Sequence, residues 1–170
     1  MERLWSPWRS QYISTFGSEN EYKGCIFCDA LRDNRDDERF VVHRGDHTFT
    51  IMNLYPYNSG HLLVVPNVHV DTLTAIPQEA YSEMMETVRQ WITALHEVMR
   101  PQGFNIGTNL GRAGGAGIDS HVHTHIVPRW NGDVNFMPVI GETKVISEDL
   151  KETMFKLRKQ YQKVLLTETV

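Results

Sequence analysis

The segment at residues 121–128, HVHTHIVP, limits the possible folds of this chain more than any other feature of the sequence. Successive side chains of a β-strand point to opposite faces of the sheet, so the rings of His121, His123 and His125 share one face. The apolar or small residues between them share the other. Such a strand fits where a sheet separates a hydrophobic core from a polar site. A polar face that is rich in histidine by chance is the alternative, but it would use three of the chain's eight histidines in alternating positions.

The length and composition indicate one globular domain spanning residues 1–170. With 41% hydrophobic residues the chain can bury a core of its own, and it is short for two domains. Lys and Arg number 17 against 21 Asp and Glu, so the net charge is -4 and we expect neither a nucleic-acid nor a membrane partner. The sequence lacks an apolar run long enough for a membrane span, and its N-terminal residues lack the apolar middle of a secretory signal. We therefore expect a cytoplasmic protein.

The order of the expected elements predicts an α+β fold. Alternating or β-rich runs predict five strands, at residues 39–43, 48–52, 61–66, 104–110 and 121–128. Apolar residues at helical spacing predict a long helix over 80–99 and a C-terminal helix over 147–168. Residues 1–24 contain aromatic side chains without a clear period, and we interpret them as an arm. We expect an antiparallel sheet of about five strands, with the helices on one side and the active site on the histidine face.

Two kinds of chemistry suit a row of histidines. In one, the imidazoles hold a zinc ion and its catalytic water. In the other, a neutral imidazole attacks phosphorus or a carbonyl directly, since an unperturbed histidine is largely unprotonated at neutral pH. Neighbouring same-face Cα atoms of a strand lie roughly 6.5–7 Å apart, so adjacent histidines reach a single ion easily and all three only by leaning strongly. The row alone leaves both chemistries open.

The segment before the histidines, NLGRAGGAGIDS at 109–120, is rich in glycine. Peptide N–H groups of such a segment can turn inward around an anion, which suits phosphate oxygens. The segment is not a Walker loop, because it lacks Gly-Lys-Ser/Thr and leads into a strand instead of a helix. Taken alone, a flexible connector is an equally good interpretation. Its position next to the histidines favours a phosphate-binding loop.

These residues resemble the histidine triad (HIT) superfamily of nucleotide hydrolases and transferases. HVHTHIVPR fits the family's pattern of three histidines alternating with hydrophobic residues, with Thr124 as a mild departure. The likeness continues in residues 50–69, in CIFC and in PRWNGDVNFMP at 128–138, and it covers roughly residues 22–140. The SPWR sequence of the arm and the extension after the histidines are most similar to the bacterial diadenosine tetraphosphate phosphorylases, also called ATP adenylyltransferases. The resemblance implies the HIT-like fold.

The resemblance also implies a covalent nucleotidyl-histidine mechanism. His123 would attack the α-phosphorus of an adenine nucleotide in line with the leaving group, and phosphate or water would then release the nucleotide. His125 would help to hold the α-phosphate. His121 would be the supporting member of the three.

A nucleotide-binding site is implied by the same resemblance. Asn53 occupies the position that binds the ribose hydroxyls in relatives, and Asn109 is placed to reach phosphate oxygens. Many relatives carry a glutamine or serine four or three residues before the first histidine, where this chain has Gly117 and Ile118. Either backbone N–H groups assist the leaving group here, or the preferred substrate differs. The base would lie in an apolar slot formed by Ile26, Phe27, Ile51 and Leu54.

Cys25 and Cys28 form a C-x-x-C pair, which in a cytoplasmic chain indicates metal or redox chemistry. Together with His43 and His47 they match the spacing of a zinc finger. The histidines of a finger share a helix, however, whereas Arg44-Gly45-Asp46 predicts a hairpin turn between these two. Resemblance to zinc-bearing family members implies a structural zinc held by Cys25, Cys28, His69 and His121. Two reduced cysteines packed near the surface are the alternative.

The roles of two further residues stay open at this point. His61 follows Ser59-Gly60 at the start of a strand and is either a partner of the active-site histidines or a turn residue. Arg129 meets either a distal phosphate or a nearby carboxylate.

The leading hypothesis is cleavage of a dinucleoside polyphosphate, such as diadenosine tetraphosphate, with phosphate or water as the acceptor. A hydrolase of adenosine phosphoramidates is the nearest alternative among enzymes. An adenine-nucleotide sensor without turnover and a zinc-stabilised scaffold are alternatives of other classes. Members of the family usually form a homodimer or a higher homo-oligomer, and the sequence itself shows no interface.

Overall fold

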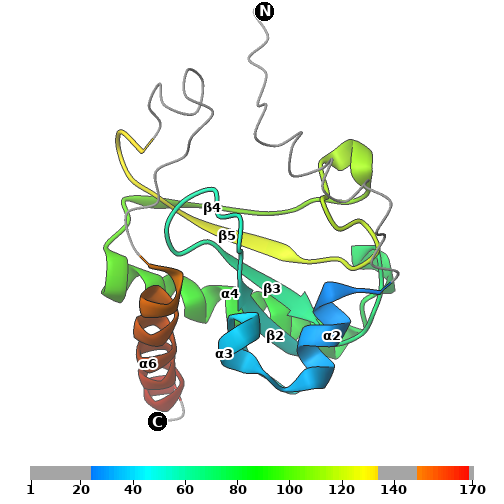
Figure 1. The fold of residues 1–170 in the computed structure, drawn as a ribbon, viewed down its shortest axis with the longest axis horizontal. Helices are drawn as coiled ribbons and strands as arrows, with labels where there is room; N and C mark the ends of the chain where they lie inside the picture. The colour runs from blue at the N-terminus through cyan, green and yellow to red at the C-terminus, as the bar shows by residue number, and fades with distance from the viewer. Residues whose placement is uncertain (1–23, 134–148, 169–170) are drawn as a thin grey trace, which may run out of the picture.

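A computed structural model describes residues 24–133 and 149–168 of the chain. Within these residues five strands form one antiparallel sheet in the order β1-β2-β3-β5-β4. The α+β fold with a five-stranded antiparallel sheet is therefore confirmed (Figure 1). The arm predicted over 1–24 lies almost wholly outside the described residues, as do residues 134–138 of the family likeness. The strands are β1 (Val41–Arg44), β2 (Thr48–Met52), β3 (Leu62–Pro66), β4 (Gly103–Thr108) and β5 (Thr124–Arg129).

The last strand begins later than the sequence predicts. Thr124 pairs with Thr108 of β4 and with Val64 of β3, and it is the first residue of β5. His121 and His123 precede this ladder. The backbone between them is held by the loop after β3 and not by a neighbouring strand, since the Val122 N–H donates to the Val70 carbonyl at 2.7 Å.

The predicted alternation of side chains survives this change. Val122 and Ile126 belong to the hydrophobic core that the long helix covers, and the Thr124 hydroxyl contacts Met84 of that helix. The histidines consequently point to the opposite face of the sheet.

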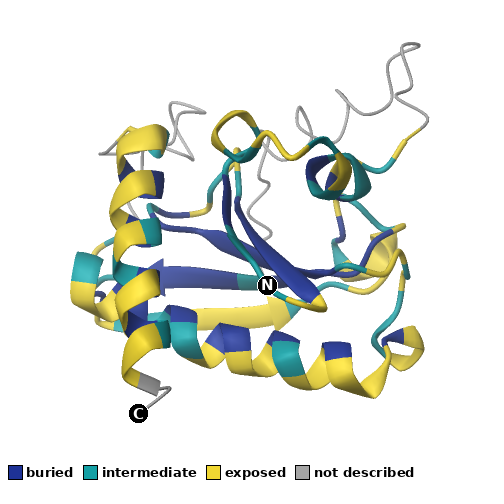
Figure 2. Cartoon of the chain, turned by 90° about the horizontal axis from the view of Figure 1, so that it is seen from below, coloured by how far each residue is buried: buried dark blue, intermediate teal, exposed yellow. Residues whose placement is uncertain are grey.

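Two helices cover the apolar face that Val122 and Ile126 share. The long helix α4 (Gln78–Met99) buries Met84, Val88, Trp91 and Leu95 against the sheet, which identifies its apolar stripe as core. The C-terminal helix α6 (Leu150–Glu168) packs against α4 and β1. Figure 2 shows the buried positions of α4 turned toward the sheet and its exposed positions turned away. The inner stripe of α6 consists of Met154, Leu157, Tyr161 and Val164.

A third helix, α2 (Ile26–Asp33), covers part of the other face, so the expectation that all helices lie on one side is wrong. Its buried residues Phe27 and Ala30 pack against strand residues that alternate with those facing α4. Arg44 donates to the carbonyls of Ala30 and Leu31 at the end of this helix. The helix has eight residues, too few to establish a helical period in the sequence. It brings the cysteine pair to the histidine face.

The remaining elements are short. Helix α3 (Asp36–Arg39) precedes β1, and the 3-10 helices η1 (Leu73–Ala75) and η2 (Arg112–Gly114) lie in loops. None of the helices within the described residues combines the length and apolar character that crossing a membrane requires.

A buried hydrogen bond joins the core helix to the middle of the sheet. Trp91 is 0% exposed, and its indole N–H donates to the hydroxyl of Thr50 on β2 at 2.9 Å. The indole also stacks on Tyr161 of α6, with ring centroids 4.0 Å apart. Because water cannot reach the Trp91 N–H, the Thr50 hydroxyl is the acceptor that offsets the cost of burying this donor.

Replacing that acceptor should destabilise the protein. We expect Thr50→Val to lower the free energy of unfolding by about 1–3 kcal/mol, the cost of leaving a buried donor unsatisfied. In a Trp91→Phe background the same change should cost clearly less, because the donor is absent. Urea unfolding of the four proteins measures this coupling. Thr93→Val on the exposed side of α4 is the matched control and should change stability by at most about 0.5 kcal/mol. Equal costs in both backgrounds would contradict the coupling.

Candidate active site and metal site

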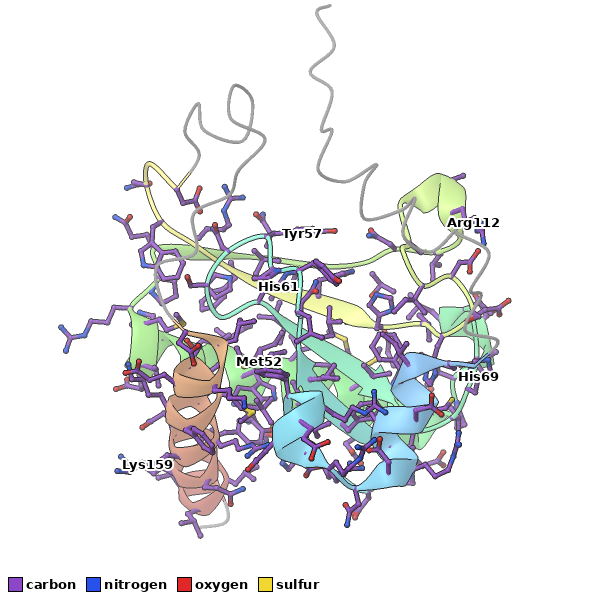
Figure 3. All side chains as sticks on the ribbon, viewed as in Figure 1. Met52, Tyr57, His61, His69, Arg112 and Lys159 are labelled. Atoms are coloured by element: carbon purple, nitrogen blue, oxygen red, sulfur yellow. The ribbon has the colours of Figure 1, made fainter. Side chains whose placement is uncertain are left out.

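Four metal-ligating side chains meet beside α2. The ligand atoms of Cys25, Cys28, His69 and His121 all lie within 4.8 Å of one another. Nδ1 of His121 is 3.3 Å from the sulfur of Cys25 and 3.6 Å from that of Cys28. Nδ1 of His69 is 3.3 Å from the sulfur of Cys28 and 3.2 Å from Nδ1 of His121. Figure 3 places His69, in the loop after β3, next to α2. The four residues predicted to hold a zinc ion are thus brought together, and His43 and His47 are not among them.

The four separations of 3.2–3.6 Å are close to those of tetrahedral zinc. With Zn–N near 2.0–2.1 Å and Zn–S near 2.3 Å, tetrahedral ligands are separated by about 3.3–3.8 Å. Nε2 of His121 donates to the carbonyl of Pro66 at 2.9 Å, because a carbonyl oxygen only accepts. The lone pair of His121 therefore lies on Nδ1 and faces the thiols. This second contact fixes the ring as carbonyl partners do in zinc proteins.

The electrostatics of the cysteine pair also suit a metal. Burial raises the pKa of Cys25, but when the His121 ring is protonated its Nδ1–H hydrogen bond and its charge, together with two backbone N–H groups, outweigh burial and lower the pKa to about 6. Burial and the neighbouring Cys25 raise the pKa of Cys28. One sulfur of the pair is therefore readily available as the thiolate that binds a metal.

His123 is held by the backbone of the residue two positions earlier. Its Nδ1 donates to the carbonyl of His121 at 2.9 Å, so Nδ1 carries the proton and Nε2 carries the lone pair of the neutral ring. Burial lowers the pKa of His123, which keeps the imidazole neutral at pH 7. The ring is 4% exposed and packs against Phe27, with centroids 5.0 Å apart.

A chain of hydrogen bonds sets the protonation of His125. The backbone N–H of Tyr57 donates to Nδ1 of His61 at 3.1 Å, so the proton of the neutral His61 ring is on Nε2. That Nε2 lies 2.9 Å from Nδ1 of His125 and donates to it. Nε2 of His125 then carries a proton, and the centroids of His125 and His123 are 4.9 Å apart. Tyr57 and His61 lie next to each other (Figure 3), with ring centroids 4.7 Å apart. His61 is a partner of the histidine row, one of the two possibilities that the sequence leaves open.

Gly60 gives His61 its position at the start of β3. Its backbone adopts a φ of +76°, and an added Cβ would lie 2.5 Å from the Met99 sulfur. Only glycine combines this conformation with the close approach of α4.

The residues predicted to bind a nucleotide differ in their hydrogen bonds and in their burial. The side-chain oxygen of Asn53 accepts from the Tyr55 N–H at 2.9 Å, and its Nδ2 is 3.3 Å from Nδ1 of His61. Asn109 donates to the Gly115 carbonyl at 3.3 Å. Of the predicted apolar slot, Phe27 and Ile51 are buried in the core beneath α2. The exposed members of the predicted set are Ile26, Leu54 and Gly117.

A cavity of about 330 Å³ lies next to His125. Its volume is at the low end of the range for small-molecule sites. Among the described residues the lining includes His125 and Asn109 but neither His123 nor the predicted apolar slot. Most of the lining comes from the β4 side of the site and from the loops after β2 and β5, including Tyr57, Asn58, Asn105, Gly107, Arg129 and Asp133.

Comparison with known proteins identifies the family of this chain. A family model for the HIT domain matches residues 34–132. The chain belongs to the HIT family. The resemblance seen in the sequence is thereby confirmed, and with it the general class of nucleotide hydrolases and transferases.

Two proteins are particularly similar to this HIT protein. One of them, from Mycobacterium tuberculosis, bears the name AP-4-A phosphorylase and is 37% identical over 158 residues, which cover 90% of this chain and 80% of that protein. The other is the crystal structure of a Zn-bound histidine triad family protein from Mycobacterium smegmatis. It has a TM-score of 0.69 and 26% identity, and the match covers 85% of this chain and 97% of that one.

The sequence analysis missed several residues around the cavity. Tyr57 and Asn58 belong to the stretch YPYNSG, which directly precedes the predicted strand at 61–66. Its two aromatic residues next to an Asn-Ser-Gly turn were the available signal. Asn105 and Gly107 lie in a strand without any distinguishing pattern, and Asp133 lacked a recognisable partner in the sequence.

Loss of a metal ligand should lower both the zinc content and the stability of this HIT protein. We expect Cys28→Ser to reduce bound zinc, measured by atomic emission, from about one ion per chain to a small fraction. The melting temperature should fall by roughly 5–10 °C, because a metal that binds only the folded state adds about 2–3 kcal/mol.

The matched control is His47→Gln, which replaces the histidine of the zinc-finger spacing that lies outside the cluster. It should leave the zinc content unchanged. Zinc loss in His47→Gln but not in Cys28→Ser would contradict the assignment.

Proposed function

We propose that this chain cleaves dinucleoside polyphosphates, such as diadenosine tetraphosphate, at the α-phosphate through a covalent nucleotidyl-histidine. The hydrogen bond from His123 to the His121 carbonyl is the observation that carries the proposal. It leaves Nε2 with a lone pair on a ring that burial keeps neutral. An imidazole in this form is a nucleophile without prior removal of a proton.

In the first step Nε2 of His123 forms a bond to the α-phosphorus. The bond from that phosphorus to the bridging oxygen breaks, and ATP leaves with the bonding electron pair when the substrate is diadenosine tetraphosphate. His125 carries its proton on Nε2, as the contact with His61 requires, and that N–H donates to a non-bridging oxygen of the α-phosphate. His61 acts as a positioning residue through His125.

In the second step an acceptor oxygen attacks the α-phosphorus of the adduct and the P–N bond breaks. The electron pair returns to Nε2 of His123. Phosphate as the acceptor yields ADP, and water yields AMP. The name of the Mycobacterium tuberculosis relative, AP-4-A phosphorylase, supports phosphate as the acceptor.

The remaining predicted residues bind the nucleotide in this proposal. Asn53 accepts or donates to the ribose hydroxyls, and its contact with His61 links the ribose site to the histidines. Asn109 lines the cavity that His125 faces and meets phosphate oxygens there. Backbone N–H groups at Gly117 assist the leaving oxygen. The base packs against the apolar slot of Ile26, Phe27, Ile51 and Leu54.

Zinc has a structural role in this proposal. Cys25, Cys28, His69 and His121 would hold it in a closed set of four ligands, which leaves no position for a catalytic water. Bound zinc would fix the position of His121. The carbonyl of that same residue orients His123, so the metal site supports the nucleophile without touching the substrate.

The covalent step makes His123 indispensable. We expect brief exposure to α-labelled dinucleoside polyphosphate to leave acid-labile label on the protein, and we expect no label on His123→Ala. Its kcat/KM should fall by about 10⁴- to 10⁶-fold, as for other nucleophile deletions. His96→Ala, which removes an exposed histidine of α4, is the control and should behave as the unchanged protein. Turnover that persists in His123→Ala would exclude the covalent mechanism. Nucleotide binding without any turnover in the parent protein would identify a sensor.

Product analysis distinguishes the acceptors and the alternative substrates. Diadenosine tetraphosphate in phosphate buffer should yield ADP and ATP, measured by ion-exchange chromatography. AMP and ATP at every phosphate concentration would identify a hydrolase instead. Faster turnover of adenosine 5′-phosphoramidate than of diadenosine tetraphosphate would favour the phosphoramidate hydrolase.

A further inference from the structure

The cavity next to His125 extends away from the predicted base slot. Asn53 follows β2, and its backbone N–H donates to the carbonyl of His61, the residue just before β3. Gly107 of β4 pairs with His125 on the opposite side of β5 from β3. The cavity lies on this β4 side and ends at Arg129 and Asp133. An adenylyl group held at Asn53 and His123 would leave this space to the rest of the substrate.

We propose that this cavity is a subsite for the leaving polyphosphate, in which Arg129 binds phosphate oxygens and selects substrates with an anionic leaving group. The inference rests on the proposed function, because it concerns the half of the substrate that leaves the α-phosphorus. It assigns a specificity-determining role to Arg129 that the histidine mechanism does not require.

Asp133 pairs with Arg129 and accepts four hydrogen bonds, three of them on Oδ2. Its carboxylate accepts from Nε and Nη2 of Arg129 at 2.6 and 2.8 Å, from Nδ2 of Asn58 at 2.6 Å and from the Trp130 N–H at 3.1 Å. Hydrogen bonds from Arg129 hold the pKa of this carboxyl well below its usual range. These hydrogen bonds hold the Asp133 carboxylate in place. Its negative charge is balanced by the Arg129 guanidinium, so it repels an anionic ligand little.

The guanidinium is the open member of this pair. Its side chain is 38% exposed, against 9% for Asp133. Besides its two bonds to Asp133, it donates from Nη1 to Asn105 at 2.5 Å. Arginine has five N–H donors, so with respect to residues 24–133 and 149–168 one hydrogen on each terminal nitrogen remains for a ligand. A planar guanidinium that is already oriented loses little side-chain entropy when it binds a phosphate.

Gly107 provides the room for such a ligand. It is the residue before the last of β4, where glycine weakens the strand, and it lines the cavity. A Cβ at this position would meet nothing within 4 Å, so neighbouring atoms do not require glycine. Its φ is also not in the left-handed range. We therefore infer that glycine at this position keeps the cavity next to His125 open.

Tyr57 and Asn58 complete the wall of the subsite. The ring of Tyr57 stacks on His125 with an interplanar angle of 16°, and Asn58 donates to both the Pro128 carbonyl and Asp133. The loop that carries these residues is thereby fastened to the end of β5. Arg129 and His125 both belong to β5, and both line the cavity.

The test compares two substrates that share an adenylyl half. Diadenosine tetraphosphate has three further phosphates, and adenosine 5′-phosphoramidate has none. In Arg129→Met we expect the ratio of their kcat/KM values to fall by about 10- to 100-fold, the range for loss of hydrogen bonds to a charged group. Arg129→Lys, which keeps the charge but loses the fork, should recover part of the ratio. Arg89→Met removes an exposed, salt-bridged arginine of α4 and should leave both values unchanged.

A second variant tests the open space of the subsite without disturbing Asp133, which fastens the loop of Tyr57 and Asn58. Gly107→Val fills the cavity without touching the pair of Arg129 and Asp133, and a β-branched residue suits a strand. It should lower the same ratio about 10-fold with no loss of melting temperature. An equal fall for both substrates in the two variants, or no fall in either, would overturn the subsite.

Binding of inorganic tripolyphosphate keeps this inference independent of turnover. Calorimetry should detect binding to the unchanged protein, and the affinity should fall about 10-fold or more in Arg129→Met. If neither nucleotide is turned over but tripolyphosphate binds through Arg129, the subsite stands and the proposed reaction fails. If diadenosine tetraphosphate is cleaved but tripolyphosphate does not bind, the reaction stands and the subsite is wrong.

Discussion

His121 makes two contacts on which both sites depend. Its ring faces the two thiols and His69 through Nδ1, and its carbonyl accepts a hydrogen bond from Nδ1 of His123. The ring is further fixed by the carbonyl of Pro66. His121 is 0% exposed. It therefore determines both the position of one of the four metal-ligating atoms and which nitrogen of His123 bears the lone pair. A rotation of its backbone would disturb both features together.

The sheet supplies the support for this residue from both faces. On one face Val122 and Ile126 anchor the histidine segment in the core under α4, and burying each apolar side chain is worth about 1.5–3 kcal/mol. On the other face Phe27 of α2 packs against the rings of His121 and His123. Because the segment is held from both faces, its polar side chains keep their positions although two of them precede the strand ladder.

Much of the fold and part of the site follow from the sequence. The alternating and helical periods predicted all five strands and both long helices, since these patterns reflect which side of an element meets the core. The C-x-x-C pair and family resemblance led to the four clustered ligands. Helix α2 was missed because eight residues with two buried positions make too short a pattern. The start of β5 was wrong because it depends on where β3 and β4 end, which a single segment does not reveal.

What the sequence by itself determined is local: the alternation of histidines with core residues, the apolar stripes of α4 and α6, and the kinds of side chain available for chemistry. Side-chain direction along a strand or helix follows from backbone geometry, so neighbouring residues suffice. The tertiary structure alone decided the tautomers of His61 and His125, and the pairing of Arg129 with Asp133 next to a cavity that Gly107 lines. These features depend on distances of a few ångströms between atoms of different segments. Such distances are fixed only when the two cores pack.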